Sequence, residues 1–150
     1  ITARDPALID ALLDAIDPFR FVKGIGFYTF PLDLAAQLKT PPAERAQMRG
    51  SFSGPANRAA TEEAIRQWYA RIDRSRLALI GVGGIFRADD AYRSIRLGAS
   101  LAQVYTALVY RGPAVVGEIK RGLAHLLARD GFADVAEAVG ADHPQGRREH

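Results

Sequence analysis

Three short runs of mainly apolar residues stand out along the chain, each bounded by glycine, proline or polar residues. They cover residues 21–28, 77–82 and 99–105. Apolar runs of this length, without strict alternation, are typical of strands that are buried on both faces of a parallel sheet. We therefore predict three strands, at Phe21–Tyr28, Leu77–Val82 and Leu101–Tyr105.

Around these runs, apolar positions recur every three or four residues, which indicates amphipathic helices. The helices are expected at 6–16, from a cap at Thr61 to about residue 72, at 88–97 with a stop at Gly98, from Pro113 to a stop at Gly131, and near 134–139. The irregular stretch 29–53 is compatible with one more short helix, over 32–38 or over 42–48.

Helices that alternate with strands predict an α/β fold with right-handed crossovers, so the strands should lie parallel and adjacent in chain order. A (β/α)8 barrel needs eight such strands and about 250 residues. Three strands fit only part of a barrel, with the missing strands supplied by absent sequence, another chain or a second copy. A small open three-stranded sheet with helices on both faces would satisfy the same pattern.

Two of the predicted strands end in residues that suit a phosphate group. Gly83 and Gly84 can adopt positive φ and let a ligand approach backbone N–H groups. Tyr105 and Thr106 end the next strand at the same edge. Because barrel enzymes often bind a phosphate between their last two strands, this edge is a candidate phosphate site. The alternative is that the glycine pair forms only a tight turn.

Composition excludes several other classes of function. The chain of 150 residues is 48% hydrophobic and 25% charged, with a net charge of +3 and no cysteine. It therefore has no disulfide, thiolate metal site or cysteine nucleophile, and its three histidines are not spaced as metal ligands. The chain has no basic stripe with interleaved aromatic residues, so no nucleic-acid partner is expected. No apolar run approaches the length of a membrane helix.

Three segments resemble the dihydroorotate dehydrogenase family. They are LIGVGGI (79–85), GASLAQVYTALVYRGP (98–113) and GFADVAEAVG (131–140). The likeness covers residues 51–140 and is weak across 21–42. It implies the C-terminal portion of a TIM (β/α)8 barrel over residues 1–140, with 141–150 as a polar tail. It also implies FMN as cofactor and the oxidation of dihydroorotate to orotate in pyrimidine biosynthesis.

The resemblance assigns roles to individual residues. Backbone groups at Gly83, Gly84, Tyr105 and Thr106 would hold the FMN phosphate, and Gly54 matches a glycine-rich turn with the same role. From spacing alone, Gly54 is better explained as a simple turn residue. The hydroxyl of Thr106 would add one donor.

No catalytic residue is expected here, because the family's serine or cysteine base and its lysine belong to an earlier loop. The family also places an asparagine against the substrate pyrimidine. This chain reads GFYTFP there, so Thr29 or Phe30 occupies that place, and we take Thr29 as the substrate-binding residue. That departure keeps open a divergent or non-catalytic barrel fragment that binds phosphate or flavin.

The ending VYRGP resembles the quinone-linked branch of the family more than the fumarate-linked branch. We therefore expect a cytoplasmic protein or one that is peripheral to the inner membrane. The electron acceptor itself stays open among quinone, fumarate and NAD.

Overall fold

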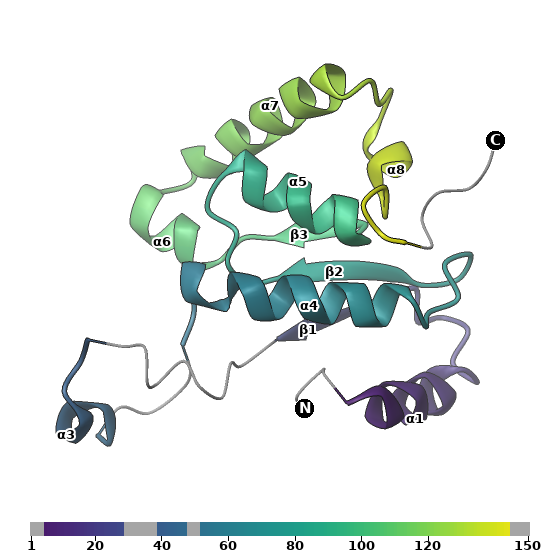
Figure 1. The fold of residues 1–150 in the computed structure, drawn as a ribbon, viewed down its shortest axis with the longest axis horizontal. Coiled ribbons are helices and arrows are strands. Elements are labelled where there is room, and N and C mark those ends of the chain that lie inside the picture. The colour runs from purple at the N-terminus through teal and green to yellow at the C-terminus, as the bar shows by residue number, and fades with distance from the viewer. Residues whose placement is uncertain (1–4, 29–38, 48–51, 145–150) are drawn as a thin grey trace.

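The computed structural model describes residues 5–28, 39–47 and 52–144 (Figure 1). None of the helices in these ranges is long and apolar enough to cross a membrane. The elements are α1 (Pro6–Ile16), β1 (Gly24–Tyr28), α3 (Pro42–Arg45), the 3-10 turn η1 (Pro55–Asn57), α4 (Arg58–Tyr69), β2 (Ala78–Val82), α5 (Ala88–Leu97), β3 (Leu101–Gln103), α6 (Thr106–Arg111), α7 (Ala114–Arg129) and α8 (Val135–Ala138).

The three strands form one parallel sheet in the order β1-β2-β3, which confirms the predicted topology. Gly24 lies opposite Ala78, and Ile80 lies opposite Leu101. Each crossover carries a helix, α4 between β1 and β2 and α5 between β2 and β3. The carboxyl ends of the strands therefore meet at one edge, as a site built from strand-end loops requires.

One face of the sheet is packed against helices (Figure 1). Ile25 and Leu79 belong to a cluster in which α1 and α4 supply Ile9 and Trp68. Ala102 of β3 packs with residues of α5, α6 and α7 in a second cluster. This one-sided cover matches the wall of a β/α barrel, whose helices lie outside the strands.

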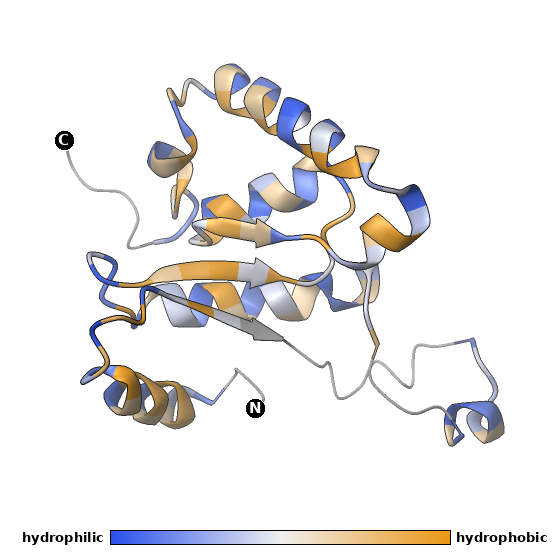
Figure 2. Cartoon of the chain, turned by 180° about the vertical axis from the view of Figure 1, so that it is seen from behind, coloured by the Kyte–Doolittle hydropathy of each residue, from blue (hydrophilic) through white to orange (hydrophobic). Residues whose placement is uncertain are grey.

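Figure 2 looks onto the opposite face of the sheet, with the strands nearer to the viewer than α4, and no described helix covers this face. Because side chains alternate along a strand, this face carries Ile80 and Val82 of β2 and Leu101 and Gln103 of β3. Leu101 is 58% exposed. Bulky apolar side chains on an uncovered sheet face fit the interior of an incomplete barrel, where layers of such side chains normally meet.

Two strands are shorter than the apolar runs predict. β1 begins at Gly24, and Phe21, which was expected inside it, is 79% exposed. β3 ends at Gln103, so Tyr105 and Thr106 do not end a strand. Thr106 instead begins α6, a six-residue helix that sequence reasoning missed. No glycine or proline separates the strand from the helix, and α6 is too short to show a helical period.

Helix α4 begins earlier than expected. Pro55 starts η1, which leads directly into α4 at Arg58, so Thr61 is not a cap. Thr61 is buried, and its hydroxyl donates to the carbonyl oxygen of Val82 at 3.1 Å. The side chain that resembles a cap in the sequence therefore joins α4 to the end of β2.

The first part of the polar segment 141–150 is packed. Asp142 forms an ion pair with Arg96 of α5. His143 is buried, and its Nε2 lies 3.2 Å from the carbonyl oxygen of Arg66. The chain after α8 therefore lies against α4 and α5, and residues 145–150 of the predicted tail lie outside the described residues.

Candidate functional site

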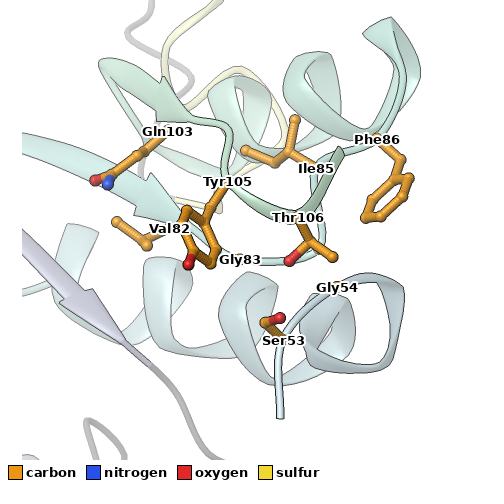
Figure 3. A pocket seen from close by; sticks show the side chains of 10 residues that line it. Ser53, Gly54, Val82, Gly83, Ile85, Phe86, Gln103, Tyr105 and Thr106 are labelled. Carbon is orange, nitrogen blue, oxygen red and sulfur yellow. The ribbon is translucent and has the colours of Figure 1, made fainter. Parts of the chain in front are cut away.

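A small pocket lies at the carboxyl edge of the sheet, between the loops that follow β2 and β3 and the segment before η1 (Figure 3). It is lined by Ser53, Gly54, Val82, Gly83, Gly84, Ile85, Phe86, Gln103, Tyr105 and Thr106. All five residues predicted to bind cofactor are among them. The structure thus brings together positions from three separate segments.

The glycines of the pocket adopt the backbone conformation that the sequence suggests. φ is +96° at Gly54, +117° at Gly83 and +74° at Gly84. Side chains disfavour this region, so each position favours glycine. The prediction that the turn after β2 uses positive φ is confirmed.

The missing side chains of the glycine pair face helix α4, contrary to the expectation that they clear space for a ligand. A Cβ at Gly84 would lie 2.6 Å from the Cα of Arg58, and one at Gly83 would lie 2.8 Å from Oγ1 of Thr61. Only Gly54 faces other pocket residues, since its Cβ would lie 3.4 Å from Cγ2 of Thr106. The pair at 83 and 84 is therefore required for close packing of the turn on α4.

The turn after β2 is held by charged side chains. Arg58 donates from Nε to the Gly84 carbonyl at 3.4 Å and pairs with Asp90 at 2.9 Å. Asp90 in turn accepts from the amides of Phe86 and Arg87, at 2.9 and 3.0 Å. Those two amides are engaged, so donors for a ligand must come from elsewhere in the pocket.

The segment carrying Gly54 is joined to α4 as well. Asn57, at the end of η1, donates from Nδ2 to the carbonyl oxygen of Phe52 at 2.7 Å. Asn57 is 1% exposed. The start of α4 therefore contacts both loops that carry the pocket glycines, which sets their separation.

The third side of the pocket is the beginning of α6. Figure 3 shows the Thr106 side chain between the rings of Tyr105 and Phe86, with Ser53 on the neighbouring segment. Thr106 is the first residue of α6 and lines the pocket, and the N–H of a first helical residue has no acceptor within its helix. Tyr105 is 69% exposed and lies at the pocket rim.

Titratable groups with clearly shifted pKa values gather away from this pocket. Hydrogen bonds from Arg129 and Tyr92 lower the pKa of Asp130 to about 2. Burial, followed by the hydrogen bond to Asp130, raises the pKa of Tyr92. Asp130 joins the end of α7 to α5, so this cluster is structural.

Sequence reasoning identified some pocket residues and missed others. The turn and α6 positions were found through glycine and the strand-end pattern, but Phe86, Gln103 and the supporting Arg58 were not. Asp90, which supports the turn from the first turn of α5, was not singled out either. Thr29, predicted to contact substrate, lies outside the described residues.

Comparisons with known proteins agree with the resemblance seen in the sequence. The family described as dihydroorotate dehydrogenase matches residues 25–127. A protein of Anaeromyxobacter dehalogenans named dihydroorotate dehydrogenase (quinone) is 52% identical over 103 residues, covering 68% of this chain and 28% of that protein. A second, from Anaeromyxobacter sp. strain Fw109-5 and with the same name, is 44% identical over 141 residues and covers 94% of this chain and 36% of its own length.

A solved structure shares the fold. The crystal structure of DHODH from Eimeria tenella in complex with ferulenol aligns with a TM-score of 0.79 and 28% identity, over 96% of this chain and 37% of that one. The chain thus spans about a third of the length of its relatives, 28% and 36% of the two curated proteins above.

Proposed function

The chain belongs to the dihydroorotate dehydrogenase family, and from that premise we propose that it forms the phosphate-binding part of a flavin enzyme that oxidises dihydroorotate to orotate. The flavin is FMN, and the reaction belongs to pyrimidine biosynthesis. One observation carries the proposal. The residues that the resemblance assigns to the FMN phosphate, Gly54, Gly83, Gly84, Tyr105 and Thr106, line a single pocket.

The residues present fit a phosphate group. Three glycines with positive φ turn the backbone sharply around the pocket, and successive N–H groups in such turns form concavities that bind anions. At the start of α6, Thr106 adds its backbone N–H and its hydroxyl. Hydrogen bonds from such groups to a charged acceptor contribute about 1.5–3 kcal/mol each.

When bound, FMN supplies the hydride acceptor for dihydroorotate, and the protein supplies binding and orientation. The residues of this chain hold the phosphate end of the cofactor and so fix where its ring lies. The catalytic base comes from outside residues 1–150. Thr29, which follows Tyr28 in the sequence, is proposed to contact the pyrimidine of the substrate through its hydroxyl.

The remaining barrel strands come from outside residues 1–150, in absent sequence, another chain or a second copy. Both edges of the sheet and its uncovered apolar face favour such a partner. The relatives are named for a quinone. We therefore infer a quinone as the electron acceptor, and a protein in the cytoplasm or peripheral to the inner membrane.

A second candidate is a divergent barrel that binds FMN or another phosphate ligand without oxidising dihydroorotate. The chain carries Thr29 or Phe30 at the place where the resembled family has an asparagine. Phenylalanine offers a pyrimidine edge no polar group, and threonine offers fewer than asparagine does. This departure favours a changed substrate over a lost cofactor.

The experiment is purification of the full-length protein and identification of its flavin by absorbance and chromatography. Anaerobic addition of dihydroorotate is expected to bleach the flavin absorbance, and added quinone is expected to restore it. Bound FMN that dihydroorotate does not reduce would support the second candidate. A protein that neither retains nor binds FMN would contradict the first candidate and would leave of the second only a barrel for another phosphate ligand.

A further inference from the structure

Arg58 contacts the pocket turn at two points from behind. Its Nε donates to the carbonyl oxygen of Gly84 at 3.4 Å, and its Nη2 lies 2.9 Å from Oδ1 of Asp90. Its Cα lies against the turn so closely that a Cβ at Gly84 would be only 2.6 Å away. The guanidinium fork thus joins a backbone carbonyl of the turn to a carboxylate.

Asp90 holds the other half of the turn. Its Oδ2 accepts from the amides of Phe86 and Arg87, at 2.9 and 3.0 Å, and its side chain is 7% exposed. Phe86 is held from a second direction, since Nη1 of Arg111 donates to its carbonyl oxygen at 2.6 Å. The backbone from Gly84 to Arg87 is therefore held by three charged side chains.

Among the charged side chains that hold the turn, Arg58 matters most, because its positive charge offsets the negative charge of Asp90. A buried carboxylate without its cation is unfavourable and would repel an anion bound to the same turn. With Arg58 in place the carboxylate is neutralised, and Asp90 can order the turn without opposing a phosphate. Neither Arg58 nor Asp90 lines the pocket, so both act through the turn.

We propose that Arg58 is a positioning residue for phosphate recognition, which it achieves by fixing the Gly84 carbonyl and neutralising Asp90. This inference rests on the proposed function, because it assumes that the pocket binds the phosphate of a flavin. It predicts that loss of Arg58 weakens recognition of the phosphate specifically, while the rest of the cofactor site is unchanged.

The test uses the full-length protein, stripped of flavin and titrated with FMN and with riboflavin, which lacks the phosphate. Arg58→Met keeps most of the aliphatic stem but removes the guanidinium. The expected result is at least a tenfold weaker affinity for FMN, about the loss of one charged hydrogen bond. Affinity for riboflavin should stay within about twofold, so the preference for FMN falls.

Two variants serve as controls. Arg66→Met removes an arginine of the same helix whose side chain pairs with Glu63 on the surface, and it should leave both affinities unchanged. Arg58→Lys keeps the charge but cannot contact Gly84 and Asp90 with one planar fork, so its loss of preference should be smaller than that of Arg58→Met. Thermal unfolding of each variant establishes that it is folded.

The outcomes separate the two proposals. A wild-type protein that binds FMN no better than riboflavin has no phosphate site here, and the proposed function is wrong at that point. A wild-type preference for FMN that survives unchanged in Arg58→Met overturns only the role of Arg58. Equal losses for both flavins would show a merely structural role and overturn it too. If Arg58→Met does not fold, an unchanged preference in Arg58→Lys overturns the proposal.

Discussion

A single absent Cβ determines how the glycine turn meets helix α4. Because a Cβ at Gly84 would lie 2.6 Å from the Cα of Arg58, the backbones must move apart to accept a side chain. The position also has φ of +74°. We expect Gly84→Ala to lower the free energy of unfolding by about 2–4 kcal/mol, from backbone strain and overpacking together. Chemical denaturation measures it.

Gly131→Ala is the matched control. Gly131 has φ of +82°, but nothing lies within 4 Å of the Cβ that it lacks. The control therefore carries backbone strain of about 1–2 kcal/mol without the clash. Equal losses in the two variants would show that the contact with Arg58 is easily relieved.

Thr106 is expected to contribute modestly to ligand binding. It lines the pocket at the start of α6, and its hydroxyl is one donor among several backbone N–H groups. Thr106→Ala in the full-length protein should weaken FMN binding by about 1 kcal/mol, or roughly fivefold. Flavin titration measures the change, and Thr106→Ser, which keeps the hydroxyl, should bind like wild type. A Thr106→Ser variant as weak as Thr106→Ala would exclude the hydroxyl as the cause.

At the scale of elements, Asp130 ties the end of α7 to α5. Its Oδ2 accepts from the hydroxyl of Tyr92 at 2.9 Å and lies 3.0 Å from Nη1 of Arg96. With Arg129 as the main cause, the pKa of Asp130 falls from 3.8 to about 2 in the folded protein. A carboxylate with a lowered folded-state pKa stabilises the fold above its unfolded pKa and loses this effect as pH falls through its folded pKa.

Asp130→Asn should therefore destabilise the protein at pH 7, and the difference from wild type should shrink as the pH falls from about 4 toward 2. Unfolding midpoints measured across that range test the expectation. Asp10→Asn is a suitable control, because its carboxylate pairs with Arg71 while 62% exposed. A destabilisation by Asp130→Asn that stays constant down to pH 2 would exclude the ionised carboxylate as its source.

At the scale of the whole molecule, the sheet has one face without a described cover (Figure 2). Leu101 is 58% exposed on it, and Tyr110 and Val109 of α6 are 79% and 70% exposed. Parallel sheets are stable when both faces are buried. Residues 1–150 alone are therefore expected to associate or to bind a hydrophobic dye, as measured by sedimentation and dye fluorescence. A monomer that unfolds cooperatively and binds no dye would contradict the partial barrel.

Much of this architecture is determined by local pattern. The apolar runs and the periodic segments between them specify three strands with helical crossovers, and the fixed hand of such crossovers makes the strands parallel and ordered along the chain. Glycines at 54, 83 and 84 mark the pocket turns because positive φ strongly favours this residue. These features follow from chain chemistry within a few residues, so the sequence alone suffices to predict them.

Tertiary contacts decided what local pattern leaves ambiguous. Thr61 resembles a helix cap but bonds to Val82, 21 positions away, and Arg58 reaches Gly84 across 26 positions. His143 resembles a tail residue but packs 77 positions from its partner Arg66. A polar side chain has the same local signature whether water or a distant backbone group satisfies it. Only folding brings that distant group within reach. The glycines of the pocket can therefore be predicted from the sequence, whereas the side chains that hold its turns are identified only in the tertiary structure.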